Sequence, residues 1–282
     1  MEPLISYFQK LDDAYKGYLK NVQEEYDEEV VHNLRITVKK IKASFFFFQF
    51  CFHGFDAKKG YQNYKEVFQR LGTIRDLQIQ QKKFTDWSRE YNINFTPYIN
   101  YIKNEENLHK YNFSFYFKKI PLNNFRKISH RLNNKLSEHE LNEKAVAYLE
   151  HIIGNIRSFD ISSFHTYEEI HNLRKQFKEL QYNLSMLETC LFSRKMYKSI
   201  LTKLKTLTEE LGNWHDNYNL LSHLFAFKLN FFRTKPKQLK RINSFEKELI
   251  SLNSAQMNNL QKHFSEFCFY SLKIEKHWKQ HD

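Results

Sequence analysis

The chain has 282 residues, enough for a sizeable hydrophobic core, and its 44 Lys and Arg against 32 Asp and Glu give a net charge of +12 at pH 7. Only 6 Gly and 4 Pro accompany a hydrophobic content of 41%, which favours long helices and excludes a turn-rich β fold. The basic surplus, shared by both halves, favours polyanion, nucleic-acid or anionic-membrane partners and excludes cationic ones.

Apolar residues at helical spacing predict a chain made of helices. Two helices are predicted to begin after the acidic residues at 27–29 and 168–169, which suit the positive end of a helix dipole. Charged and turn-forming residues at 118–140 separate residues 1–120 from residues 141–282, and a basic turn follows at 233–237. We therefore expect an all-α protein with four helices in each half. The other predicted helices cover residues 2–22, 58–90, 96–117, 141–158, 194–230 and 242–276.

An internal repeat connects the two halves. The segment VHNLR at 31–35 recurs as IHNLR at 170–174, an offset of 139 residues, and LGTIRD at 71–76 matches LGNWHD at 211–216. The apolar stripe of the first motif helix also recurs at the same offset in the second. This register predicts an internal duplication with pseudo-twofold symmetry. The two stripes are Leu34, Val38, Ile41, Phe45, Phe48 and Phe52, and Leu173, Phe177, Leu180, Leu184, Leu187 and Leu191.

Basic residues form a second stripe on each motif helix, predicted to face away from the core. In the second half Gln181 and Glu179 stand where the first half has Lys42 and Lys40. A single basic stripe is usually solvated surface, but its repetition favours a shared anionic ligand. Side by side, the stripes would form one groove for a linear phosphate polyanion. The stripes consist of His32, Arg35, Lys39 and Lys42, and of His171, Arg174 and Lys178.

Two glycines and two aspartates repeat in the same register. Gly72 and Gly212 lie inside predicted helices, where glycine is unfavourable, so we expect them to permit close helix packing. Asp76 and Asp216 follow Arg75 and His215, and either orient basic groups by ion pairing or form ordinary exposed pairs. The contribution of Arg75 and His215 to a site is left open.

These repeated HxxRxxxK and Leu-Gly segments resemble the conserved histidine α-helical domain family, CHAD, over nearly the whole chain. The resemblance implies one domain of two four-helix bundles that binds inorganic polyphosphate through a basic surface. We expect no cofactor and no metal. Glu179 and Gln181 depart from the family's basic pattern. Association with polyphosphate granules, targeting and regulation are roles that the sequence leaves open. Further basic residues are candidate rim contacts: Lys118, Lys119, Arg126, Lys127, Lys235 and Lys237.

The basic, Phe-rich sequence bears on three other function classes. An enzyme is disfavoured because the sequence has no phosphate-binding loop, metal-ligand cluster or nucleophile motif. Nucleic-acid binding is the main alternative, since it uses the same charge physics, but the aromatics of the motif helices, such as Phe45 and Phe177, belong to the apolar stripes. A membrane-surface role for the Phe-rich segment is the third.

Cysteine usage and the N-terminus bear on the compartment. Cys51, Cys190 and Cys268 show no metal-binding spacing, and the N-terminus has no signal-peptide pattern. We therefore expect a cytoplasmic protein with reduced thiols. The most apolar run, residues 45–52, is 8 residues long, whereas a membrane span needs about 20, so no membrane insertion is predicted.

Overall fold

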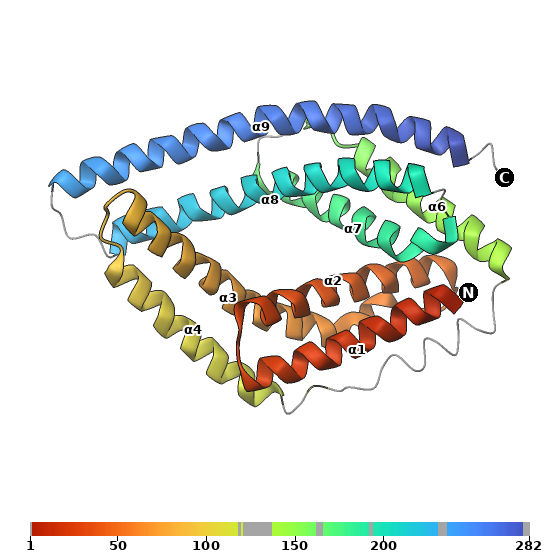
Figure 1. Cartoon of the computed structure of the whole chain (residues 1–282), viewed down its shortest axis with the longest axis horizontal. Helices are drawn as coiled ribbons and strands as arrows, with labels where there is room; N and C mark the ends of the chain where they lie inside the picture. Colours follow the sequence, from red (N-terminus) through yellow and green to blue (C-terminus); the bar gives the residue numbers. More distant parts are fainter. Residues whose placement is uncertain are drawn as a thin grey trace.

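The computed structural model describes residues 2–117, 120, 137–161, 166–191, 194–230 and 236–278. Within these ranges the chain forms eight α-helices and no strand, which confirms the all-α prediction (Figure 1). No helix in them is long and apolar enough to cross a membrane. The helices are α1 (Glu2–Glu24), α2 (Glu28–Cys51), α3 (Ala57–Glu90), α4 (Thr96–Phe117), α6 (Glu138–Arg157), α7 (Tyr167–Leu191), α8 (Arg194–Asn230) and α9 (Pro236–Trp278).

The predicted helices are all present, and the two clearest shifts in their starts have local causes. Helix α9 begins at Pro236 rather than at residue 242; proline suits the first helical position because the N–H that it lacks would be unpaired there. Helix α6 begins at Glu138, inside the predicted boundary, because Ser137 and Glu140 form a capping box. Residues 118, 119 and 121–136 lie outside the described part, and the internal duplication stays a prediction.

Both motif helices, α2 and α7, have well-defined starts. The Asp27 carboxylate accepts hydrogen bonds from the backbone N–H groups of Glu29 and Val30, at 2.8 and 3.0 Å. At the start of α7, the Thr166 hydroxyl donates to the Glu169 carboxylate at 2.8 Å, and the Glu169 N–H donates back to that hydroxyl at 3.3 Å. These caps satisfy N–H groups that would otherwise lack partners, and they fix where the first turn of each motif begins.

The predicted apolar stripes lie in the main core. In α2 the stripe residues Leu34, Val38, Ile41, Phe45 and Phe48 are buried, whereas Phe52 is half-buried at the C-cap. In α7 the stripe is buried from Leu173 to Leu187. The Leu191 side chain lies outside the described part. Phe47 of α2 contacts Tyr148 of α6, with ring centroids 5.4 Å apart, so this core continues from one half into the other.

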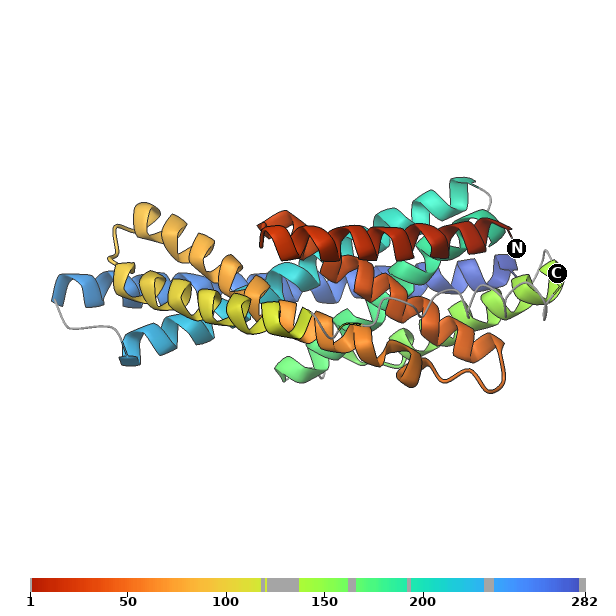
Figure 2. The same cartoon turned by 90° about the horizontal axis from the view of Figure 1, so that it is seen from below.

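A second core lies at the end of the molecule opposite the two termini (Figure 1). There α3 and α4 pack against α8 and α9, and Trp87 meets Phe245 with ring centroids 4.5 Å apart. Figure 2 shows the resulting elongated, flat molecule, in which α9 follows the long axis. The two halves therefore join at both ends of their long helices. The second core consists of Phe84, Trp87, Ile93, Phe95, Tyr98, Ile102, Leu220, Leu224, Phe227, Ile242, Phe245 and Leu249.

Candidate anion-binding surface

The basic stripes of α2 and α7 meet because the two helices pack against each other. Lys39 of α2 lies within electrostatic reach of Arg174 and Lys178 of α7. Together with Arg35, these residues are here called the basic cluster. All four side chains are half-buried rather than fully exposed. The structure thus brings together cations of the two motif helices that are at least 135 residues apart in the chain.

Arg35 faces α3, which corrects the expectation of an outward stripe. Its Nη1 donates a hydrogen bond to the Phe68 carbonyl at 2.7 Å, and its guanidinium lies 4.2 Å from the centroid of the Phe68 ring. Burial lowers the pKa of Arg35, and the nearby Asp76 carboxylate opposes that shift. The guanidinium is therefore fixed against α3, in a geometry that leaves Arg35 less free than a surface arginine.

Lys39 occupies the centre of the basic cluster. Its Nζ lies 5.6 Å from the centroid of the Phe68 ring, a weak cation–π contact. Burial, followed by the positive charges of Arg174, Arg35 and Lys178, lowers its pKa to about 8. Within the described residues no salt bridge joins Lys39, Arg174 or Lys178 to a carboxylate. The Lys39 ammonium is thus partly buried among three like charges, which the Asp76 carboxylate offsets only in part, at a cost to the folded protein.

The remaining α2 candidates lie at the edges of this surface. Lys42 is exposed, with Nζ 5.6 Å from the Phe46 ring centroid. His32 is exposed as well, yet partial desolvation and the charge of Arg75 lower its pKa. Arg75 is itself paired with the Glu28 carboxylate at 2.5 Å. Among the described residues Lys42 has no salt-bridge partner and lies at the rim, whereas His32 is mainly a neutral group at neutral pH.

In α7, His171 is not a cation of the stripe but a neutral ring inside a stack. Its ring lies 5.5 Å from that of Tyr167 and 5.1 Å from that of His215, nearly parallel to both. Burial and the charge of Lys175 lower the pKa of His171 to about 4. Its Nδ1 is buried without a hydrogen-bond partner. His171 is therefore neutral at pH 7, and its predicted contact with phosphate stays a prediction.

Arg174 and Lys178 keep their positions on the stripe. Lys178 donates a hydrogen bond to the Gln181 side chain at 3.1 Å, and burial together with Arg174 lowers its pKa. The Arg174 Nε is buried and has no hydrogen-bond partner. Glu179 accepts a hydrogen bond from Tyr148 of α6 at 3.0 Å. Because Glu179 is engaged with α6, its negative charge is directed away from the basic cluster.

The two predicted glycines and aspartates behave differently in the two halves. A Cβ on Gly72 would lie 2.6 Å from Nη1 of Arg35, whereas a Cβ on Gly212 would meet no described atom within 4 Å. The expectation of close packing is therefore confirmed at Gly72 and wrong at Gly212. Burial raises the pKa of Asp76 while Arg35 and His215 oppose that rise. Asp216 contacts His215 at 3.4 Å.

Residues that sequence reasoning did not select also shape the surface. Phe68 contacts both Arg35 and Lys39, and it precedes Gly72 by one helical turn, a spacing that could have indicated it. Tyr167 and Tyr218 place aromatic rings beside the motif of α7. This corrects the expectation that the aromatics here belong only to the apolar stripes. Of the predicted rim residues, Lys237 is exposed in the first turn of α9 and the other five lie outside the described residues.

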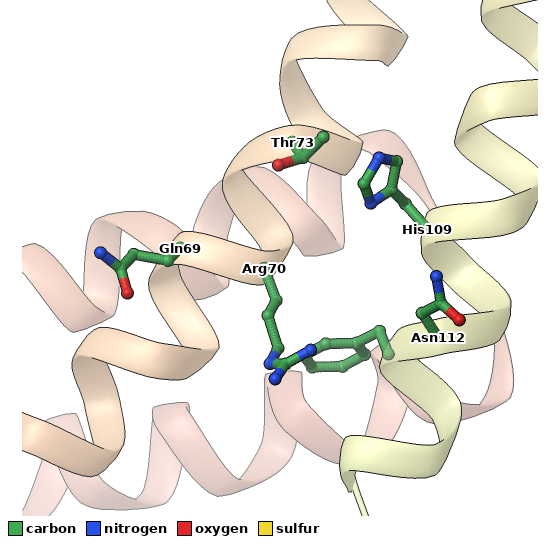
Figure 3. Close-up of a pocket in the computed structure, with 6 residues that line it drawn as sticks. Gln69, Arg70, Thr73, His109 and Asn112 are labelled. Carbon is green, nitrogen blue, oxygen red and sulfur yellow. The ribbon is translucent and has the colours of Figure 1, made fainter.

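A separate pocket lies between α3 and α4, on the face of α3 that points away from α2. Figure 3 shows Thr73, His109 and Asn112 around its opening, with Arg70 on the other side. Its volume is about 280 Å³. The Arg70 guanidinium stacks 4.2 Å from the Tyr116 ring centroid, and the Tyr116 hydroxyl donates to Glu66 at 2.6 Å. The pocket is therefore distinct from the basic cluster, because it is lined by residues of α3 and α4 and has the Glu66 carboxylate near it.

The described residues offer neither a metal-binding group nor a reactive thiol. They contain no group of three or more His, Cys, Asp or Glu side chains that could hold a metal ion. Cys51 is a buried free thiol and Cys268 a half-buried one, while the Cys190 side chain lies outside the described part. Burial raises the pKa of both described thiols, Cys51 to about 12, which makes them poor nucleophiles.

Comparison with known proteins points to one family. The family model of the CHAD domain matches residues 6–224. The structure is similar to the crystal structure of the CHAD domain from the plant Ricinus communis, with a TM-score of 0.66 and 12% sequence identity, over 94% of this chain and 91% of that chain. At this identity the likeness shows the fold. No curated protein matches the chain.

Proposed function

The chain belongs to the CHAD domain family, and we propose that it binds inorganic polyphosphate at the basic cluster without catalysing a reaction. Arg35, Lys39, Arg174 and Lys178 would contact the phosphates, and Lys42 would extend the contact at the rim. His32 and His171 would act as neutral neighbours that donate or accept hydrogen bonds. The proposal rests on the arrangement of these side chains and on the family.

The observation that carries the proposal is the environment of Lys39. Burial of its ammonium and the like charges of both motif helices lower its pKa to about 8, against the opposing effect of the Asp76 carboxylate. A fold with no anionic ligand gains nothing from this repulsion. A phosphate anion among the four cations would reverse it, since each contact becomes a charge-assisted hydrogen bond. The repulsion in the free protein therefore supports an anion as the partner of this surface.

The shape of the surface favours a single phosphate chain over a nucleic-acid duplex. The basic cluster lies in the seam between α2 and α7, with its cations half-buried. A thin, flexible chain of phosphates can lie along the line where the two helices pack and present an oxygen to each cation. The phosphates of a duplex follow a wide cylinder and reach mainly exposed lysines and arginines. Nucleic-acid binding remains the alternative, and the competition experiment below distinguishes the two.

Competition between the two polyanions tests the proposal directly. Fluorescently labelled long-chain polyphosphate is bound to the purified protein, and unlabelled polyphosphate or duplex DNA is added at equal phosphate concentration. We expect polyphosphate to displace the label at least tenfold more effectively than DNA, at both low and moderate salt. Equal displacement at both salt concentrations would show a nonspecific effect of the +12 charge. Preferential displacement by DNA would favour the alternative.

The absence of catalysis has its own test. The protein is incubated with polyphosphate or nucleoside triphosphates and Mg²⁺, and released phosphate is measured over several hours. We expect no release above that of a heat-denatured control. Steady release that disappears in His32→Ala would contradict the proposal and identify an enzyme.

A further inference from the structure

Five aromatic and imidazole rings form a continuous stack between the start of α7 and the middle of α8. Tyr218 and Tyr167 have ring centroids 4.5 Å apart at 24°, and Tyr167 continues to His171 at 5.5 Å and 10°. His171 then meets His215 at 5.1 Å and 26°, and Trp214 lies 5.6 Å from Tyr218 at 27°. These five residues are here called the aromatic stack. Nearly parallel rings at these centroid distances form offset-stacked pairs, an arrangement that further flat rings can extend.

The aromatic stack and the basic cluster share one face of α7. Tyr167, His171, Arg174 and Lys178 follow one another at steps of four, three and four residues, the spacing of a single helix face. Burial raises the pKa of Tyr167 and the positive charge of Arg174 opposes that rise, so Arg174 acts directly on the stack. At about 1.5 Å per residue, Arg174 lies about 10 Å along the axis from Tyr167 and Lys178 about 16 Å. On this face of α7, two stacked rings are therefore followed by two cations.

In the first half, the start of the motif helix is linked to the next helix without aromatic rings. There Glu28, at the start of α2, pairs with Arg75 of α3 at 2.5 Å. At the matching place in the second half, the Tyr167 hydroxyl and the His215 Nε2 share a hydrogen bond of 2.7 Å. Both pairs tie the start of a motif helix to the next helix. Since an ion pair does this in one half, the fold does not require a stack in the other.

One ring of the aromatic stack is reached by solvent. Trp214 is buried, but Tyr218 keeps 39% of its surface exposed although it stacks on Tyr167 and Trp214. Every nucleobase has a flat π-face, and stacking on an exposed tyrosine is tolerant of base identity. An inorganic phosphate chain has no such face and would leave Tyr218 unused. An exposed ring that is connected to the cations of α7 through Tyr167 and His171 thus matches a ligand that carries both a base and phosphates.

We propose that Tyr218 stacks a nucleobase while the basic cluster holds the phosphates of the same molecule, so that the protein also binds nucleoside oligophosphates such as ATP. This inference rests on the proposed phosphate binding at the basic cluster and adds a specificity for the base. The stack offers one exposed ring rather than a series of them, which fits a mononucleotide better than a nucleic-acid strand. The phosphates would lie along α7 from Arg174 toward Lys178 and Lys39.

A comparison of ATP with inorganic tripolyphosphate isolates the contribution of the base. Both carry three phosphates, and tripolyphosphate has at least as much negative charge, so electrostatics alone would favour it. We expect calorimetry to give ATP about tenfold higher affinity, the effect of one stacked base. Tyr218→Ala should bring ATP down to the affinity of tripolyphosphate and leave tripolyphosphate unchanged, whereas Tyr218→Phe should retain the difference. Tyr111→Ala, which removes an exposed tyrosine of α4, is the matched control and should change neither.

The outcomes separate the two proposals. Equal affinity of the unaltered protein for ATP and tripolyphosphate would overturn the base site and leave phosphate binding intact. A preference for ATP that survives Tyr218→Ala would also overturn it. Failure of both ligands to bind would overturn the base site together with the proposed function. If single-stranded oligoadenylate bound far more tightly than ATP at equal phosphate concentration, the ligand would be a nucleic-acid strand, and the mononucleotide assignment would be wrong.

Discussion

A Cβ atom on Gly72 would lie 2.6 Å from Nη1 of Arg35. The guanidinium cannot move away freely, because the same nitrogen donates to the Phe68 carbonyl at 2.7 Å and the group stacks on the Phe68 ring. Glycine in the middle of α3 therefore makes room for an arginine of α2. Gly212 has no such neighbour among the described atoms, so the two glycines form a natural pair of test and control.

Gly72→Ala and Gly212→Ala should change stability in opposite directions. Alanine gains about 1 kcal/mol over glycine inside a helix. At position 72 this gain is opposed by displacement of the Arg35 hydrogen bond, which as a charged contact contributes about 1.5–3 kcal/mol. We expect Gly72→Ala to lower the free energy of unfolding by about 1 kcal/mol and Gly212→Ala to raise it by up to about 1 kcal/mol, measured by urea unfolding. Equal stabilisation by both changes would show that Arg35 does not depend on Gly72.

Phe45→Ala should strongly destabilise the main core. The Phe45 side chain is fully buried and meets the rings of Phe55 and Tyr64 at 5.8 and 5.9 Å. Removing a buried phenyl group typically costs about 3–5 kcal/mol, because the cavity refills only in part. Phe225→Ala, at a position that is 57% exposed, should cost less than about 1 kcal/mol. Thermal unfolding followed by circular dichroism compares the two, and similar melting temperatures would contradict the core assignment.

Much of the fold could be predicted from the sequence because apolar spacing is a strong signal in long helices. The stripe from Leu34 to Phe48 and its counterpart from Leu173 to Leu187 are buried as expected. The ends were less predictable, since Pro236 and the capping box at Ser137 act through local backbone hydrogen bonds rather than through periodicity. The second core was not predicted, because its packing joins helices that no sequence pattern connects.

The candidate site was predicted in composition but not in geometry. Spacing placed Arg35 and Lys39 on one face, and the structure adds that Phe68 and α3 cover part of that face. The distinction between His32, exposed at the edge, and His171, stacked on Tyr167, depends on neighbours from other helices. These neighbours come from tertiary packing, which is why the two HxxRxxxK motifs lie in different environments. The sequence indicated the similarity of the halves and the replacements at Glu179 and Gln181, whereas the different environments of the two histidines could be seen only in the structure.

Neutralising the centre of the basic cluster should weaken binding while it stabilises the free protein. In Lys39→Gln with Lys178→Gln, two half-buried ammonium groups that repel Arg174 lose their charge. We expect unfolding to require about 1 kcal/mol more at low salt, and polyphosphate affinity to fall at least tenfold, since charged hydrogen bonds contribute about 1.5–3 kcal/mol each. Isothermal titration calorimetry and urea unfolding measure the two effects.

The matched control for this pair is Lys103→Gln with Lys247→Gln, two exposed lysines of α4 and α9. The net charge changes by the same amount in both double variants. The control should leave stability nearly unchanged and reduce affinity only slightly, with a loss that disappears as salt screens exposed charges. If the control lost as much affinity as the first pair, binding would depend on total charge rather than on the basic cluster.

Polyphosphate affinity should decline as the pH rises through about 8. In the free protein the pKa of Lys39 is lowered to about 8, from 10.5. An ammonium with a lowered pKa is charged below that value, so binding below pH 8 meets a cation that is already present. Above it, Lys39 must first take up a proton, and affinity falls by up to tenfold for each pH unit. The stability of the free protein changes with pH in the opposite direction. Because the unfolded chain holds the Lys39 proton up to about pH 10.5, the free energy of unfolding rises with pH between about 8 and 10.5.

To measure the effect on binding, long-chain polyphosphate is titrated at several pH values between 7 and 9.5, where its internal phosphates keep their charge. In Lys39→Gln the decline near pH 8 should disappear, leaving only the smaller loss due to Lys178, whose pKa is also lowered. If Lys39→Gln kept the pH profile of the unaltered protein, Lys39 would not be the titrating contact, and its place at the centre of the site would have to be given up.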